Sequence, residues 1–272
     1  MTDAPAAVER AVSWKLLAAA LLSASAVFLF GLDLAIIGYL ALAASLIAAA
    51  LVDRRLFKDL ALIAAGLIII SSVPLNADLS IGHMALMGGA LALAVAVPYL
   101  VSRYLYLDYA VRFPLNLRQR WSVLERWYLV IVVALCYAIL PAYLISTGVY
   151  QNWPDTTSDP NLFVRLFLGV NGVGIWDELF FICTAFTLLR RHFSVWQANL
   201  LQAVIFASFL WEIGYQAWGP LLTVPFALLQ GYMFARTRSL AYVLCVHLLF
   251  DLVLFLALVH AHNRDWLPIF FY

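Results

Sequence analysis

Charged residues are scarce in this chain of 272 residues. Asp, Glu, Lys and Arg make up 11% of it, whereas hydrophobic residues make up 65%. A soluble globular domain is about 25% charged and about 45–50% apolar. The low charge content excludes a soluble domain and favours an integral membrane protein. Long apolar runs, rather than short alternating strands, indicate a helical protein and not a barrel.

Cysteine is also rare. Cys136, Cys183 and Cys245 all fall inside apolar runs, and none of them belongs to a CxxC motif. This pattern excludes a disulfide framework or a zinc framework and predicts buried free thiols. The chain also lacks a basic tail and a basic patch interleaved with aromatic residues, so we expect no nucleic-acid partner.

Nine apolar runs account for most of the chain. They predict an all-α integral membrane protein, a multi-span bundle of about 8–9 transmembrane helices. Eight would result if the second and third runs formed a re-entrant hairpin, or if the first lay in the interface. The GGALALA stretch in the fourth run is suited to close helix packing. The runs cover about 14–30, 34–52, 60–75, 84–107, 127–147, 162–190, 195–217, 220–235 and 239–260.

The distribution of basic residues predicts the orientation. With nine spans and a cytoplasmic N-terminus, every Lys and Arg except Arg165 and Arg264 falls on the cytoplasmic side. Residues 108–126 form the longest basic connection and predict an interfacial segment with Trp and Tyr anchors. Its arginines are Arg112, Arg118, Arg120 and Arg126.

Function is expected in the C-terminal part of one membrane domain. We divide the chain into N-terminal transmembrane helices with the basic loop, residues 1–160, and a catalytic helical core, residues 161–262. The reason is that the first five runs contain no acid or His deep in a run. The last four contain Asp177, Glu178, Glu212, His247 and Asp251.

These five side chains need an explanation, because a charge at the centre of a membrane helix costs at least about 2.5–3.5 kcal/mol. Asp177 and Glu178 are adjacent and point about 100° apart, so one can face a cavity while a neighbouring helix holds the other. His247 and Asp251 are four residues apart and share a helix face. A self-satisfied His247–Asp251 pair, or a Glu212 that snorkels at the membrane exit, are the structural alternatives.

The C-terminal half resembles the CPBP family of intramembrane glutamic endopeptidases, which includes the CAAX-processing prenyl-protein proteases and bacterial relatives. The family has a Glu-Glu-x-x-x-Arg motif, a Phe-x-x-x-His motif and a His-x-x-x-Asn motif. Asp177-Glu178 stands where the first motif begins, and His247-Leu-Leu-Phe-Asp251 stands at the third. The segment from Gly231 to Leu240 resembles the family's segment before the last histidine.

Four positions depart from the family pattern. Asp251 stands where the third motif has asparagine. Ile182 replaces the motif arginine, and Asp177 replaces the first glutamate. The middle histidine is missing: one alignment matches Phe206 to the motif Phe and leaves Leu210 at the His position. The alternative, which we prefer because it keeps a polar group in the site, places Glu212 there.

The resemblance implies an intramembrane endopeptidase that hydrolyses a membrane-anchored protein or peptide near the cytoplasmic side, without a cofactor, in a bacterial cytoplasmic membrane. It implies that Asp177 is the general base, Glu178 a supporting acid and His247 a partner of the water or the oxyanion. Asp251 would fix the His247 tautomer, and Glu212 would replace the missing histidine.

Other functions stay open at this point. The altered motifs also fit a catalytically degenerate scaffold or binding protein with the same fold. Carboxylates with an imidazole can hold a divalent metal, so a metal-dependent variant is a further alternative, although no HExxH-like spacing is present. An ion-coupled carrier is a third class, which the lack of paired repeats does not favour.

Overall fold

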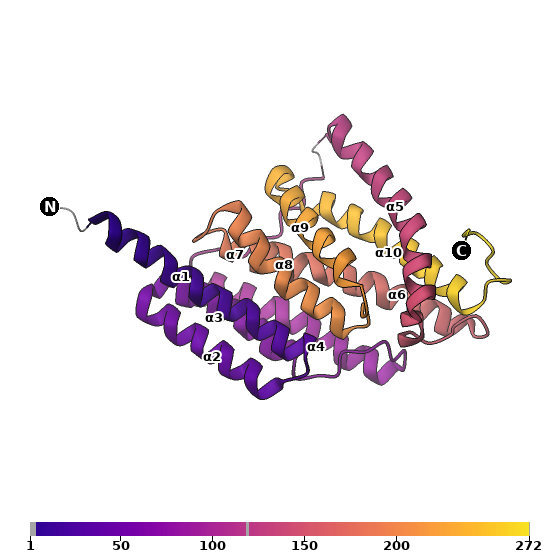
Figure 1. The fold of residues 1–272 in the computed structure, drawn as a ribbon, viewed down its shortest axis with the longest axis horizontal. Helices are drawn as coiled ribbons and strands as arrows, with labels where there is room; N and C mark the ends of the chain where they lie inside the picture. The colour runs from indigo at the N-terminus through magenta and orange to yellow at the C-terminus, as the bar shows by residue number, and fades with distance from the viewer. Residues whose placement is uncertain (1–3, 118–119, 272) are drawn as a thin grey trace.

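Helices form the whole of the regular structure in the part of the chain that the computed structural model describes, residues 4–117 and 120–271. Nine helical rods follow one another, and each coincides with one predicted apolar run (Figure 1). The rods are α1 (Ala4–Ala26) continued by the π-helix η1 (Val27–Gly31), α2 (Ala35–Val52), α3 (Arg54–Ile70), α4 (Ile81–Leu100) continued by η2 (Val101–Leu105), α5 (Val123–Thr147), α6 (Pro160–Asp177) continued by η4 (Glu178–Phe186) and α7 (Thr187–Leu189), α8 (Val195–Glu212), α9 (Pro220–Thr237) and α10 (Leu240–His262).

Six of these rods are long and apolar enough to cross a membrane: α1–η1, α2, α4–η2, α5, α6–η4–α7 and α10. By this measure the described residues provide fewer crossings than the eight or nine predicted. The helix α3 has 17 residues, and α8 and α9 carry buried polar side chains. The multi-span helical fold is nevertheless as predicted, and the protein is an integral membrane protein.

The polar side chains of α8 serve to hold α9. Asn199 donates to the carbonyl of Leu228 at 2.7 Å, and Gln202 donates to that of Ala227 at 2.9 Å. Gly231 permits this approach, because a Cβ there would lie 1.9 Å from the side-chain oxygen of Asn199. Hydrogen bonds of this kind join membrane helices where no hydrophobic effect acts between them.

The rod α6–η4 runs through the middle of the bundle. It packs against α4 and α10, and its η4 part also contacts α8 and α9. In Figure 1, α1, α2 and α3 lie together on one side of this rod, whereas α5 leans outward beside α10. Two glycines, Gly172 and Gly174, lie within α6 without interrupting it.

Ala90 and Ala94 of the small-residue stretch in α4 are buried, as close packing requires, whereas its two glycines are exposed. A Cβ added at Gly88 or Gly89 would meet nothing within 4 Å, so these two glycines leave open space. The close approach between α3 and α4 occurs at Gly66 instead, where a Cβ would lie 3.2 Å from the carbonyl oxygen of Ala94 and 2.1 Å from the Phe180 ring.

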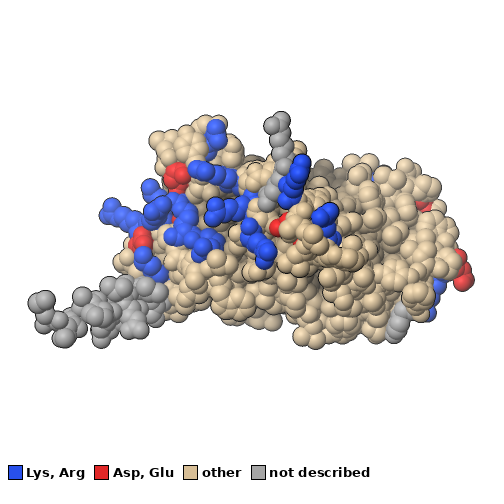
Figure 2. Space-filling view, turned by 90° about the horizontal axis from the view of Figure 1, so that it is seen from above, with Lys and Arg blue, Asp and Glu red and all other residues tan. Residues whose placement is uncertain are grey.

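Basic side chains gather toward one end of the molecule (Figure 2). The same end holds a buried ionic network. Arg191 contacts Asp59 at 2.8 Å and Asp108 at 2.7 Å, and the His192 ring lies 2.6 Å from Asp59. This network fastens the end of the central rod to α3 and to the connection that follows η2. Arg118, one of the predicted interfacial arginines, lies outside the described residues.

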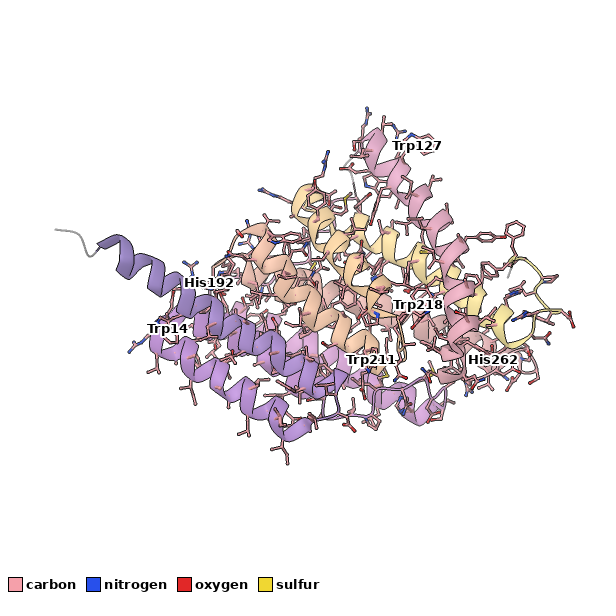
Figure 3. All side chains as sticks on the ribbon, in the orientation of Figure 1. Trp14, Trp127, His192, Trp211, Trp218 and His262 are labelled. Atoms are coloured by element: carbon pink, nitrogen blue, oxygen red, sulfur yellow. The ribbon has the colours of Figure 1, made fainter. Side chains whose placement is uncertain are left out.

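Aromatic and histidine side chains mark both ends of the bundle. Trp14 and His192 lie toward the basic end, whereas Trp211, Trp218 and His262 lie toward the opposite end (Figure 3). Amphipathic rings prefer the level of the lipid headgroups. The three cysteines are free thiols, as the sequence predicts; Cys136 and Cys183 are buried and Cys245 is partly buried.

The Asp59 network predicts a large loss of stability when it is cut. Asp59→Asn leaves Arg191 and His192 without their buried anion, and we expect a loss of about 3–5 kcal/mol in the free energy of unfolding. Lys15→Gln is the matched control, because the Lys15–Asp53 pair is about 25–30% exposed and an exposed pair is worth about 0–1 kcal/mol. Unfolding of the purified protein in mixed micelles measures both. Equal losses would contradict a structural role for the network.

Candidate functional site

The two adjacent acids lie where the α-helix changes to a π-helix. The helix α6 ends at Asp177 and η4 begins at Glu178. Thr184 and Thr187 support the wider turn, since their hydroxyls donate to the carbonyls of the residues five positions earlier, at 2.9 and 3.2 Å. Because π-turns are rare and occur often at functional sites, the position of this one at the acid pair indicates a site.

Glu178 is fully buried and holds the imidazole of His247. Its Oε1 lies 2.7 Å from Nδ1 of His247 and accepts a hydrogen bond from the Gln230 amide at 2.6 Å. Gln230 also donates to the carbonyl of Val243 at 3.1 Å. When Nδ1 carries the proton, the ring donates it to this carboxylate. Glu178, and not Asp251, is the acid that lies against Nδ1, whereas Asp251 lies near Nε2.

Gln230 is the site residue that the sequence prediction missed. It is 0% exposed and lies on α9, immediately before Gly231. The signal in the sequence was an amide in the middle of an otherwise apolar helix, because an unpaired polar group in such a place raises the free energy of the fold. Gln230 gives Glu178 a neutral donor from a third helix.

The other side of the imidazole faces two carboxylates. Nε2 of His247 lies 3.7 Å from Asp177 Oδ2 and 3.8 Å from Asp251 Oδ1, which is too long for direct hydrogen bonds. Asp177 Oδ1 and Asp251 Oδ2 have no hydrogen-bond partner among the described residues. The hydrogen-bonding capacity of these two buried oxygens is therefore unused within the described part of the chain.

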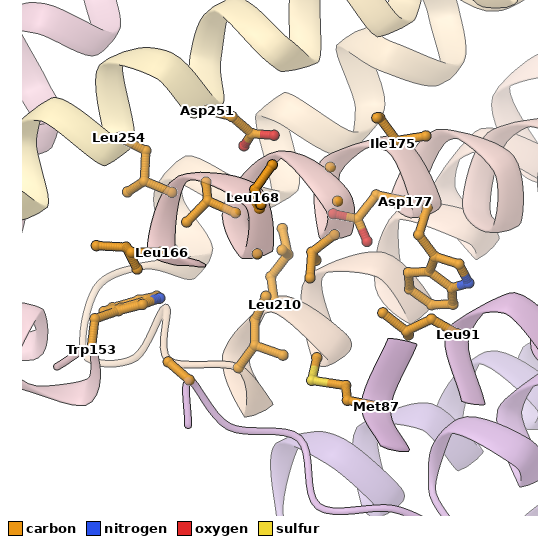
Figure 4. Close-up of a pocket in the computed structure, with 18 of the residues that line it drawn as sticks. Met87, Leu91, Trp153, Leu166, Leu168, Ile175, Asp177, Leu210, Asp251 and Leu254 are labelled. Atoms are coloured by element: carbon orange, nitrogen blue, oxygen red, sulfur yellow. The ribbon is translucent and has the colours of Figure 1, made fainter. Parts of the chain in front are cut away.

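A cavity of about 430 Å³ contains this side of the imidazole. Asp177, His247 and Asp251 line it, whereas Glu178 does not, so the two acids divide their roles as their 100° separation predicts. Figure 4 shows Asp177 and Asp251 among apolar side chains that include Leu166, Leu210 and Leu254. In such surroundings, electrostatic interactions are stronger than in water.

The cavity reaches the surface in two directions. One is the end opposite to the basic one, where residues 76–79 and Trp153 line it. The other direction is lateral, between α4 and α6, where Gly88 and Gly172 are exposed and a Cβ on either would meet nothing within 4 Å.

Glu212 does not join the other four predicted residues. It lies at the end of α8, partly exposed, and does not line the cavity. Leu210 lines the cavity instead, and the Phe206 ring lies 6.2 Å from that of His247. The geometry thus supports the alignment through Phe206 and Leu210 over the one preferred from sequence, because α8 turns Glu212 away from His247.

One comparison with known proteins identifies the family. Residues 159–253 match the family model described as type II CAAX prenyl endopeptidase Rce1-like. The match covers 95 of the 272 residues and supports membership of the CPBP family for this segment. The match covers the two acids of the central rod, Gln230, His247 and Asp251. No curated protein and no solved structure matches the chain.

The CPBP motif positions that differ here are filled by apolar side chains. Ile182, at the position of the family's arginine, is 0% exposed in the core, and Leu210 replaces the middle histidine at the cavity wall. Both replacements remove a polar group from the site, and Glu178 Oε2 is buried without a hydrogen-bond partner among the described residues. Among the described residues, no group of three or more His, Cys, Asp or Glu side chains is arranged to hold a metal ion.

Gly174 determines how closely α10 approaches the acids. A Cβ at this position would lie 1.9 Å from Asp251 Oδ2 and 3.0 Å from Cδ2 of His247. The absence of a side chain at Gly174 therefore allows Asp251 and His247 to reach α6. Sequence alone gives no reason to distinguish Gly174 from Gly172.

The two glycines provide a matched pair of variants. Gly174→Ala pushes α10 away from α6, and we expect a loss of about 1–3 kcal/mol in the free energy of unfolding, the usual cost of overpacking. Gly172→Ala fills open space in the same helix and should be neutral or stabilise by about 0.4–1 kcal/mol. Unfolding of both variants in micelles is the measurement. If Gly174→Ala leaves the free energy of unfolding unchanged, Asp251 is not held against α6.

Proposed function

We propose that this CPBP-family chain is an intramembrane endopeptidase of the glutamic, metal-independent type. It hydrolyses a peptide bond of a membrane-associated protein or peptide with a carboxylate-activated water. The observation that carries the proposal is the placement of His247: Glu178 holds one ring nitrogen, and the other faces Asp177 and Asp251 in an apolar cavity. A structural ion pair does not require such a cavity.

Asp177 is the general base in this mechanism. Its carboxylate takes a proton from a water molecule that lies within reach of Asp177 Oδ2 and His247 Nε2, and the water oxygen attacks the carbonyl carbon of the substrate. The bond from carbon to the amide nitrogen then breaks, and the proton held by Asp177 passes to the leaving amine. The electron pair of the broken bond stays on the amide nitrogen, which takes the proton, so the reaction needs no other reactant.

The remaining residues stabilise charge and position the imidazole. The doubly protonated imidazole donates from Nε2 to the developing oxyanion while Glu178 balances its positive charge through Nδ1. Asp251, in its protonated form, is a second donor on the same side. Gln230 holds Glu178 in place, so its effect on the reaction passes through His247.

The cavity favours a substrate that is itself in the membrane. Its walls are largely apolar, and its lateral side between α4 and α6 is lined by exposed small residues. A peptide with a lipid anchor can move into such an opening from the bilayer without first entering water. We place the protein in a bacterial cytoplasmic membrane, on its resemblance to the bacterial members of the family.

Substitutions at the acids test the mechanism. The purified protein in lipid vesicles is incubated with quenched fluorescent peptides that end in a prenylated CAAX sequence. A second set of the same peptides lacks the prenyl group. We expect Asp177→Asn and His247→Ala to lower kcat at least about 100-fold, since loss of a general base or an oxyanion donor costs this much. Glu212→Gln, which removes a carboxylate outside the cavity, should keep kcat within about twofold.

Three results would contradict the assignment. Cleavage that survives Asp177→Asn would exclude Asp177 as the base. Equal losses in Asp177→Asn and Glu212→Gln would mean that the site extends beyond the cavity residues. A chelator that stops cleavage by the unmodified protein would favour the metal-dependent alternative.

A catalytically degenerate binding protein is the second candidate. The observation that favours it is the replacement of two polar family positions by Ile182 and Leu210. In that case, the protein binds a membrane peptide in the same cavity but releases no product. Binding of the quenched peptides without cleavage, lost in a variant with Gly172→Leu at the lateral opening, would support this function over hydrolysis.

A further inference from the structure

A second hollow, far from the acids in sequence, lies at the basic end of the molecule. It has a volume of about 320 Å³ and is lined by Tyr99, Arg103, Tyr109, Val111, Arg112 and Phe113. Arg103 is in η2, the last turn of the α4 rod, and the other lining residues flank it in the chain. The mechanism proposed above uses none of them.

Aromatic rings surround Arg103. Its guanidinium carbon lies 5.3 Å from the centre of the Tyr109 ring, 5.8 Å from that of Tyr104 and 5.9 Å from that of Tyr99, all within the range of cation–π attraction. Its Nη1 also donates to the Tyr99 hydroxyl at 3.3 Å. These contacts orient the guanidinium but do not neutralise it.

Arg112 completes the hollow with a second guanidinium. Its Nε donates to the carbonyl of Tyr109 at 2.9 Å. This hydrogen bond orients the planar guanidinium group and leaves its two terminal nitrogens for another acceptor. Among the described residues, neither Arg112 nor Arg103 forms an ion pair. The nearest acid in the chain, Asp108, forms an ion pair with Arg191 and accepts a hydrogen bond from the Ser102 hydroxyl.

The backbone of this connection is strained in a specific way. Leu107 and Tyr109 have positive φ values of 55° and 51°, a region that costs non-glycine residues about 1–3 kcal/mol each. Asp108, between them, accepts from the Ala110 amide and contacts Arg191, while Ser102 also accepts from Ala110. Because surrounding contacts must hold such a conformation, the position of Tyr109 against Arg103 is imposed by the fold.

We propose that Arg103 and Arg112 bind the phosphate of an anionic phospholipid headgroup. Two guanidinium forks without a carboxylate partner match the geometry of phosphate oxygens. The tyrosines at the end of the α4 span mark the headgroup level, and basic pockets at the cytoplasmic side of membrane helices take anionic headgroups. This site stands on observations that are independent of the protease proposal.

Binding of phosphatidylglycerol to the full-length protein tests the site. The purified chain in phosphatidylcholine micelles is titrated with phosphatidylglycerol, and the rise in Tm gives an apparent Kd. We expect R103Q/R112Q to raise this Kd at least about tenfold, since charge-assisted hydrogen bonds are lost. R54Q/R55Q, which removes two exposed charges at the same end, is the control and should change Kd by less than about twofold.

Further arms separate the sources of binding. Inorganic phosphate should compete with phosphatidylglycerol in the unmodified protein; binding of phosphate without any binding of the lipid would overturn the lipid assignment. An equal loss in R54Q/R55Q would show attraction to diffuse charge and would also overturn it. If R103Q/R112Q has a lower Tm in phosphatidylcholine alone, R103K/R112K keeps the charge, and its Kd should still rise because lysine lacks the planar fork.

Discussion

The contact between Glu178 and His247 is the constraint on which the rest of the membrane core depends. A carboxylate that is fully buried within a bilayer needs partners, since desolvation of an unpaired ion costs several kcal/mol. Here the partners come from two other helices, His247 of α10 and Gln230 of α9. The central rod, α9 and α10 are therefore joined at one carboxylate oxygen, and the π-turn of η4 brings that oxygen to them.

This joint also explains the second half of the site. Once Nδ1 of His247 is held, Nε2 is directed at Asp177 and Asp251, and Gly174 gives Asp251 the space to approach. Ile182 and Leu210 stand at the positions of the family's arginine and middle histidine, and among the described residues Glu178 is held by the imidazole of His247 and the neutral amide of Gln230. The site keeps the carboxylate and imidazole parts of the CPBP arrangement and lacks two of its polar groups.

At the basic end of the bundle, a buried carboxylate is again paired by side chains from another segment of the chain. Asp59 is 1% exposed and is paired by Arg191 and His192, while Arg191 also occupies Asp108. Because the connection after η2 is held by this network, its two left-handed residues persist and the rings stay against Arg103. Buried acids thus position both the cavity within the membrane and the hollow at its surface.

The sequence by itself determined the helical membrane fold and singled out Asp177, Glu178, His247 and Asp251, because apolar runs and the cost of buried charge are properties of the residues. Only the tertiary structure decided which oxygen holds which nitrogen, that Gln230 belongs to the site, and that Leu210 rather than Glu212 faces it. Those outcomes depend on the rotation of each helix about its own axis. That rotation is set by close approaches at Gly174 and Gly231, which no periodicity encodes.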